Sequence, residues 1–514
     1  MGASMLRQVV ERSHFRTHGN ISASSKDNTR VLVRLAIRLF FLIVFAIGDR
    51  RTAIAGFVLE QRLTDVGGNA VVIAGERIVV GAPNEDAAKG AVHVYRYDNS
   101  TMTWLEEQKL TASDGAAGER FGFSVAIADD RIVVGSPFDN DNGLQSGSAY
   151  VFRFYPETMS WLQEQKIIAS DGAPSDRFGA STAIAGDRII IGSPLDDDKA
   201  SRSGAVYVYR LNSGTMWVQE QKFVASDGAE EDTLGISVAM EGDRIVAGAI
   251  QTNRFGSAYV FNGMSGGWEF ETKLAPHDGI VGSLFGNSVS INGDRIVVGT
   301  GFADDAYVFR RNNDTMQWTT EQKLEPFDGT LFIEFGSAVA IAGDRIIAGA
   351  PARNGGRGAV YVFGLDPDTR RWVQTQILTG TDASFRPQFG QAVAVSGERI
   401  VAGEPGSGAA YIYRFTSDSD GDGVPDEQDQ CPHSDTGTTV IIDGLDSGVA
   451  NTLLPEPAGC TITDEILTLA AEAQSHGQFV SQVDKFLLEL QEAGILEPNQ
   501  KNAIKDAAGH STLP

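Results

Sequence analysis

The sequence has 514 residues and a formal charge of −25, from 67 acidic and 42 basic side chains. Nucleic-acid-binding proteins usually carry a basic patch or domain, so this charge argues against that class. The 58 glycines are typical of many short strands joined by tight turns, and two cysteines are too few for a disulfide-stapled scaffold or a cysteine-rich zinc module.

The first 55 residues have the pattern of an export signal. Arginines lead into the apolar run 39–48, and the small-x-small triplet Ala53-Ile54-Ala55 follows. This order predicts a secretory signal peptide over residues 1–55, cleaved after Ala55, and a protein that is secreted or held at the cell surface. A membrane anchor is the alternative reading. However, a helix of this length spans about 15 Å, roughly half of a hydrocarbon core, so we expect no membrane span in the mature chain.

One segment recurs seven times between residues 56 and 416. It has the sequence GDRIVVGAP or a close variant, and the arginines of the seven copies are Arg77, Arg131, Arg188, Arg244, Arg295, Arg345 and Arg399. Such a period indicates a propeller or a solenoid array. Each copy contains four short runs with the apolar alternation of strands, and one four-stranded sheet per repeat is a propeller blade.

The two ends of the array complement each other. A tryptophan begins the fourth strand of six copies: Trp104, Trp161, Trp217, Trp268, Trp318 and Trp372. The seventh copy stops at residues 409–415 without a fourth strand, whereas residues 56–63 carry Phe57 in the tryptophan position and Gln61 four residues later. Since an open array would leave unpaired sheet edges, we predict an all-β, seven-bladed β-propeller over residues 56–416 that is closed by the N-terminal strand.

These repeats resemble the FG-GAP family, the seven-bladed propeller at the head of integrin α chains and in many bacterial surface proteins. The residues that carry the resemblance are Phe-Gly pairs such as Phe121-Gly122 and Gly-Ala/Ser-Pro triplets such as Gly135-Ser136-Pro137. Integrin propeller loops carry D-x-D-x-D-G calcium sites, which residues 57–415 lack. The acidic loops 139–143 and 196–198 are expected to be solvated hairpin turns.

Residues 417–432 follow the schedule of a calcium loop. The aspartates at loop positions 1, 3, 5, 9 and 12 are Asp418, Asp420, Asp422, Asp426 and Asp429. Gly423 takes the sharp turn at position 6, and Val424 offers its backbone carbonyl at position 7. Because calcium takes six to eight oxygen ligands, this spacing predicts a calcium site, with an acidic linker as the alternative. Together with Cys431-Pro432, the segment resembles a thrombospondin type 3 calcium repeat.

The C-terminal part is expected to be small and helical. In an exported protein the two cysteines, Cys431 and Cys460, are expected to form a disulfide, and free thiols are the alternative. Residues 433–461 are rich in glycine, proline and threonine and predict a linker. Residues 462–510 have three helical patterns with an apolar face in the second, which predicts a small helical region.

No residue pattern in the sequence predicts catalysis. The segment 263–267 fits the G-x-S-x-G pattern of hydrolases, but it lies in a predicted hairpin, whereas that pattern needs a strand-to-helix turn. The sequence therefore predicts an exported, calcium-binding, non-catalytic propeller that acts as an adhesion or surface interaction module, with a protein or glycan ligand on one face. A carbohydrate-binding, lectin-like propeller is the alternative, and an enzyme with residues gathered in the central channel is a third possibility.

Overall fold

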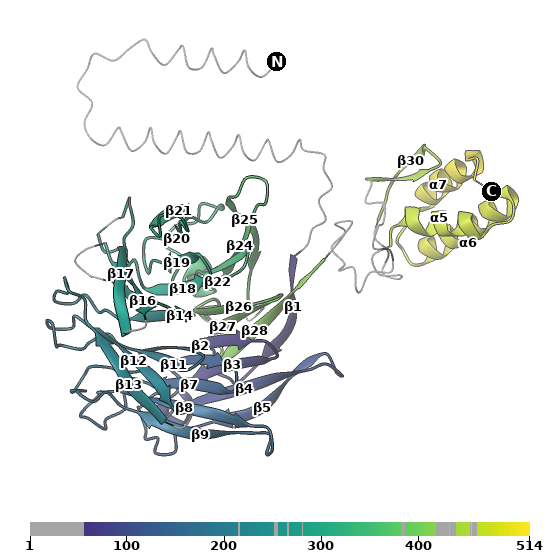
Figure 1. Ribbon diagram of the computed structural model, residues 1–514. Helices are drawn as coiled ribbons and strands as arrows, with labels where there is room; N and C mark the ends of the chain where they lie inside the picture. The colour runs from purple at the N-terminus through teal and green to yellow at the C-terminus, as the bar shows by residue number, and fades with distance from the viewer. Residues whose placement is uncertain are drawn as a thin grey trace, which may run out of the picture. The chain divides into compact units, whose positions relative to one another are not determined.

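The computed structural model describes residues 56–213, 216–250, 255–264, 267–279, 281–381, 386–417, 431, 438–452, 454 and 460–513 (Figure 1). The predicted signal peptide, residues 1–55 with its cleavage point after Ala55, lies outside them. The chain divides into two compact units, one built from the repeats and one from the C-terminal segment.

The described part of the first unit contains seven four-stranded sheets, all antiparallel, and each sheet is one blade (Figure 1). Blade 1 is β2 (Ala70–Ala74), β3 (Arg77–Ala82), β4 (Ala91–Asp98) and β5 (Thr103–Leu110). Blade 2 is β6 (Ser124–Ala128), β7 (Arg131–Ser136), β8 (Ser148–Tyr155) and β9 (Ser160–Ile167). Blade 3 is β10 (Ser181–Ala185), β11 (Arg188–Ser193), β12 (Ala205–Asn212) and β13 (Met216–Phe223).

Blades 4 to 6 repeat this order. Blade 4 is β14 (Ser237–Glu241), β15 (Arg244–Ala249), β16 (Ser257–Met264) and β17 (Gly267–Leu274). Blade 5 is β18 (Ser288–Asn292), β19 (Arg295–Gly299), β20 (Ala306–Arg311) and β21 (Trp318–Leu324). Blade 6 is β22 (Val339–Ala342), β23 (Arg345–Gly349), β24 (Val360–Leu365) and β25 (Trp372–Leu378). Two four-residue helical turns, α3 (Glu85–Ala88) and α4 (Arg353–Gly356), lie between the second and third strands of blades 1 and 6.

Blade 7 is built from both ends of the repeat array. It contains β26 (Ala392–Ser396), β27 (Arg399–Glu404), β28 (Ala409–Thr416) and the N-terminal strand β1 (Gly56–Leu63), which pairs antiparallel with β28. The first strands of successive blades contact one another, in the order β2, β6, β10, β14, β18, β22 and β26, and β26 contacts β2. The all-β propeller and its closure by the N-terminal strand are therefore confirmed.

The Phe-Gly motif recurs because it lies where two blades meet. Gly122 has a φ of 88°, and its N–H donates to the carbonyl of Gly135 in its own blade. A Cβ on Gly81 of the preceding blade would lie 2.1 Å from the Gly122 carbonyl oxygen. Side chains at these positions would therefore force neighbouring blades apart. Phe121 fills the adjacent core and packs edge-on against Tyr150, with ring centroids 5.3 Å apart.

The C-terminal unit has its own core. It contains a hairpin, β29 (Thr439–Ile442) and β30 (Leu445–Ala450), and the helices α5 (Ile462–Glu472), α6 (His476–Glu492) and α7 (Pro498–His510) (Figure 1). The three expected helices are present. The hairpin differs from the linker expected over 433–461, since Val440 and Ile442 are buried with the apolar faces of the helices. Among the described residues, no helix has the length and apolar character needed to span a membrane.

Candidate functional site

A polar latch joins the outer strands of neighbouring blades. Between blades 1 and 2, the Gln108 side-chain amide accepts from the Trp161 backbone N–H at 2.7 Å and donates to the Trp161 carbonyl at 2.9 Å. The Trp161 indole N–H donates to Glu107 at 2.9 Å, and Arg77 donates to both oxygens of the same carboxylate at 2.9 and 3.0 Å. Burial would raise the pKa of Glu107, but the bonds from Arg77 and Trp161 hold it below its usual range.

The latch repeats around most of the ring. Six arginine–glutamate pairs are present, Arg77–Glu107, Arg131–Glu164, Arg188–Glu220, Arg244–Glu271, Arg295–Glu321 and Arg399–Glu60. Each of these glutamates also accepts from the indole N–H of the next blade's tryptophan. The tryptophans that marked the fourth strands in the sequence therefore hold blades together.

The acidic loops are less solvated than expected. Asp139 is 1% exposed, and the Nζ atom of Lys166 lies 3.0 Å from its carboxylate, 2.7 Å from Asp114 and 2.7 Å from Asp141. The Tyr150 hydroxyl also contacts both Asp139 and Asp114, at 3.0 and 2.9 Å. The expectation of solvated turns was wrong for Asp139, because a lysine on the fourth strand of the same blade faces the loop.

The same arrangement occurs in blades 3 and 5. Lys222 contacts Asp171, Asp196 and Asp198 within 2.8 Å, and Lys323 contacts Asp278 and Asp305 within 3.1 Å. Asp196 is buried like Asp139, so the expectation of a solvated turn was wrong for it as well. Burial alone would lower the pKa of Lys166, but its hydrogen bonds to Asp114, Asp141 and Asp139 raise it well above its usual range. Each lysine stays charged, so these carboxylates are neutralised from within the protein.

The predicted calcium ligands lie outside the described residues. They are Asp418, Asp420, Asp422, Val424, Asp426 and Asp429, and the calcium site stays a prediction. Elsewhere, over the residues that the structure describes, no group of three or more His, Cys, Asp and Glu side chains is arranged to hold a metal ion. The G-x-S-x-G segment is flanked by a hairpin, as expected, since Met264 pairs with Gly267 between β16 and β17.

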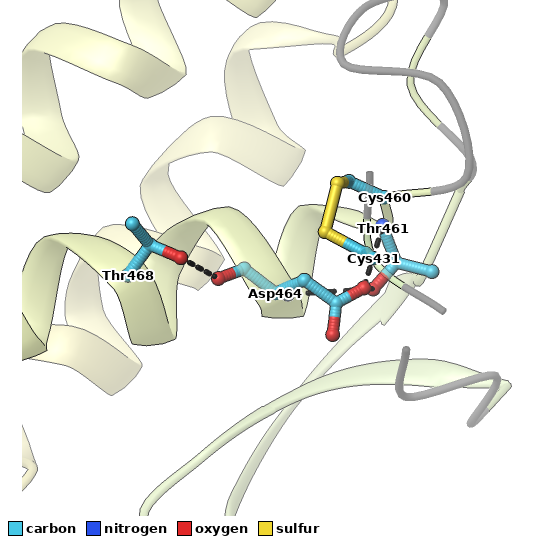
Figure 2. The surroundings of a disulfide bond; sticks show 5 residues. All are labelled: Cys431, Cys460, Thr461, Asp464 and Thr468. Atoms are coloured by element: carbon cyan, nitrogen blue, oxygen red, sulfur yellow. Dashed lines mark hydrogen bonds between the residues drawn. A yellow bond between two sulfur atoms is a disulfide. The ribbon is translucent and has the colours of Figure 1, made fainter. Parts of the chain in front are cut away.

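The predicted disulfide is present. Figure 2 shows Cys431 bonded to Cys460 directly before helix α5. The helix begins with a capping box: the Asp464 carboxylate accepts the Thr461 backbone N–H at 2.7 Å, and the Thr461 hydroxyl accepts the Asp464 N–H. In the next turn, Thr468 donates to the Asp464 carbonyl at 2.9 Å. The disulfide thus attaches Cys431, two residues after the last predicted calcium ligand Asp429, to the start of a capped helix.

Exposed apolar side chains occur on the link from blade 4 to blade 5, on a loop of blade 5 and on the link from blade 5 to blade 6. We call this set the apolar loop face and define it as Val281, Phe302, Phe327, Leu331 and Phe332, of which Phe302 is 62% and Phe332 86% exposed. Hydrogen bonds between the loops position Phe302 and Phe332 of this set. The Asp304 carboxylate accepts the N–H groups of Phe332 at 2.5 Å and Ile333 at 3.0 Å, and the Phe302 N–H donates to the Ser283 carbonyl.

Phe332 occupies an unfavourable backbone position. Its φ is 59°, in the left-handed region that favours glycine. The equivalent residues of the other described links also have positive φ and are Gly118, Ser175, Glu231, Gly282 and Arg386. A bulky, nearly fully exposed ring at this position contributes nothing to the core, and such exposed apolar groups commonly mark interaction sites. Sequence reasoning missed it, although the three aromatic residues in the link FDGTLFIEFG were a usable signal.

Comparisons with known proteins agree with the blade pattern. Residues 104–152, 161–209, 217–261, 268–309, 318–363 and 372–413 match the family model described as FG-GAP repeat, and together they cover just over half of the chain. Over 167 residues the chain is 28% identical to integrin alpha-2 of Bos taurus, and the aligned region covers 29% of this chain and 14% of that protein. Over 146 residues it is 30% identical to integrin alpha-E of Homo sapiens, and the aligned region covers 26% of this chain and 12% of that protein. The matches therefore span a small part of these relatives.

Proposed function

Because the chain belongs to the FG-GAP repeat family, we propose that it is an exported, non-catalytic adhesion or surface interaction module whose propeller binds a protein ligand. The similarity to integrin α chains supports an interaction role. The disulfide supports an oxidising, extracellular location, because such bonds persist mainly outside the cytosol. The observation that carries the proposal is the exposed ring of Phe332 on a constrained loop.

The apolar loop face also indicates the chemistry of its partner. Phe332 is a protruding aromatic group, and such groups bind best when they enter an apolar pocket on the partner. The same link carries the carboxylates of Glu325, Asp328 and Glu334. Asp328 is held ionised: burial raises its pKa, but hydrogen bonds from Thr330 and Arg353 outweigh this and leave it below its usual range. Glu325 and Asp328 are paired with Lys323 and Arg353 of the propeller, so Glu334 is the carboxylate of this link that favours a basic group at the rim of the partner's pocket. We therefore expect the partner to be a folded protein with an apolar pocket and a basic group at its rim.

Adhesion of coated beads tests this proposal. Beads carrying residues 56–514 are incubated with cells of the source organism, and bound beads are counted for the unchanged protein and for Phe332→Ser. We expect at least a tenfold loss of bound beads, because truncation of a central aromatic anchor typically weakens the binding free energy by about 2 kcal/mol or more. Met102→Ser, which removes an exposed apolar group from a hairpin of blade 1, is the matched control. Equal adhesion of Phe332→Ser and Met102→Ser would contradict the proposal.

Calcium binding is a separate part of the proposal. The spacing of Asp418, Asp420, Asp422, Asp426 and Asp429, with the Val424 carbonyl, supports a calcium site over residues 417–432. Titration calorimetry with CaCl₂ is expected to show binding that the double change Asp420→Ala, Asp422→Ala abolishes. Asp368→Ala, in an exposed turn of blade 6, leaves the binding unchanged. Retained binding in the double variant would place any calcium elsewhere.

A further inference from the structure

The joint between blades 6 and 7 lacks the side chains that fill the other joints. At the glutamate position of the latch, blade 6 has Thr375, and blade 7 presents Phe57 instead of tryptophan. On the third strand of blades 2, 3 and 5, the residues opposite the latch arginines are Arg153, Arg210 and Arg310. In blade 6 this residue is Gly364, which pairs with Arg345. Three large or charged groups are therefore replaced by smaller, uncharged ones at one joint.

A hollow of about 690 Å³ lies where these groups are missing. Its lining includes Phe57, Arg345, Gly364, Leu365, Thr375 and Phe415. This volume is within the range of sites that hold small organic molecules. Three replacements at this joint leave the space for the hollow: glycine and threonine stand in place of arginine and glutamate, and a phenyl ring stands in place of an indole ring.

Arg345 is the one latch arginine that forms no ion pair with a described residue. The other six each pair with a glutamate. The Arg345 guanidinium donates to the Gly397 carbonyl at 3.0 Å and lies over the Phe415 ring, 4.1 Å from its centroid. A half-buried guanidinium with free donors prefers a carboxylate, which it can bind through two parallel hydrogen bonds.

We propose that this hollow binds a small organic carboxylate, whose carboxylate group takes the place that Glu107 and its equivalents occupy at the other joints. Phe57 and Leu365 supply an apolar wall for the body of the ligand. The carboxylates of Asp344 and Glu398 also line the hollow and are exposed. They disfavour ligands with several negative charges and can accept hydrogen bonds from ligand hydroxyl or ammonium groups. The site is independent of the apolar loop face.

Titration with three probes tests the proposal. Residues 56–514 are titrated with D-glucuronate, benzoate and D-glucose, and heat or chemical-shift changes are recorded. We expect saturable binding of at least one carboxylate with a Kd in the millimolar range or tighter. Binding of glucuronate alone assigns the site to hydroxylated acids, and binding of benzoate assigns it to aromatic acids. Binding of neither, or of glucose as tightly as glucuronate, would overturn the proposal.

Two variants assign the binding to this joint. Arg345→Gln is expected to weaken binding at least tenfold, whereas Arg295→Gln is the matched control and leaves it unchanged, because Glu321 already occupies that arginine. Thr375→Glu restores the carboxylate of the other joints, so it is expected to abolish ligand binding while raising the Tm. Because this variant is more stable, its loss of binding is not an effect of unfolding. Undiminished binding in Thr375→Glu would contradict the assignment.

Discussion

Asp176 is 4% exposed and accepts a hydrogen bond from the Ala173 N–H at 2.7 Å. Burial raises its pKa to about 6, and the charge of Asp196 adds to this effect, although the bond from Ala173 opposes it. The folded-state pKa is thus above the usual value near 4, so the folded protein binds more protons than the unfolded chain between these values. Ionised Asp176 therefore destabilises the propeller at neutral pH, and this penalty declines as the pH falls below 6 and is gone below about pH 4.

Asp176→Asn is expected to raise the free energy of unfolding at pH 8 by about 2–3 kcal/mol, a gain that vanishes near pH 4. The neighbouring change Asp171→Asn is expected to lower the free energy of unfolding at pH 8. Burial raises the pKa of Asp171, but bonds from Lys222 and Tyr207 outweigh this and lower it, so its stabilising charge is present at pH 8 and is lost in acid. Urea unfolding at both pH values measures the two effects, and equal shifts for both variants would refute this account.

Lys166 is the counterion of a buried carboxylate. Lys166→Met keeps much of the side-chain volume but leaves Asp139 with no ammonium group, and we expect a loss of about 2–3 kcal/mol, since breaking a buried pair is strongly destabilising. Lys89→Met removes an exposed lysine that pairs with Asp86 and is expected to change stability by less than about 0.5 kcal/mol. Chemical denaturation of both variants makes the comparison. Similar losses would mean that solvent, not Lys166, neutralises the loop.

At the scale of the elements, strand β1 decides whether the ring closes. Without residues 56–63, β28 presents an unpaired edge and the joint with blade 1 loses Glu60 and Gln61. In this latch, Gln61 accepts from the Trp104 backbone N–H at 2.8 Å and donates to the Trp104 carbonyl at 2.9 Å. A chain that begins at residue 64 is expected to aggregate or unfold at least 10 °C lower than a chain that begins at residue 56, because exposed edges pair with one another. Light scattering and thermal unfolding test this, and a monomer of unchanged Tm would contradict it.

The elements could be predicted where the repeat supplied a template. Phe57 and Gln61 reproduce the spacing of the tryptophan strands. The N-terminal strand could therefore be identified as the partner of β28, although the two strands are about 350 residues apart in the sequence. Lys166 gave no such signal, because its contact with Asp139 depends on how the third and fourth strands pair. Strand β30 was missed because only Val449 of its six residues is buried, so the segment has no apolar alternation. The hollow at Arg345 could not be predicted from the sequence, because only the strand register shows that Gly364 and Thr375 lie beside Arg345.

At the scale of the whole molecule, the propeller and the C-terminal unit have separate cores. We therefore expect two unfolding transitions. All six tryptophans, from Trp104 to Trp372, lie in the propeller. Tryptophan fluorescence then reports the propeller alone, whereas circular dichroism at the helix band follows the C-terminal helices. Reduction of Cys431–Cys460 is expected to destabilise only the C-terminal unit, by about 3 kcal/mol for its 29-residue separation. A shift of the fluorescence transition on reduction would show that the two units unfold together.

The pairing of β1 with β28 also determines how the ring responds to mechanical force. Gly56 pairs with Thr416 at one end of the two strands, so a pull on the chain through both residues acts on the same end of an antiparallel pair. The interstrand hydrogen bonds then open one after another, as in a zipper, and do not share the load. Blades 1 to 6 carry none of this tension until β1 has peeled away. A tether that runs through both ends of the array would therefore give way at low force in blade 7, and the ring would open there first.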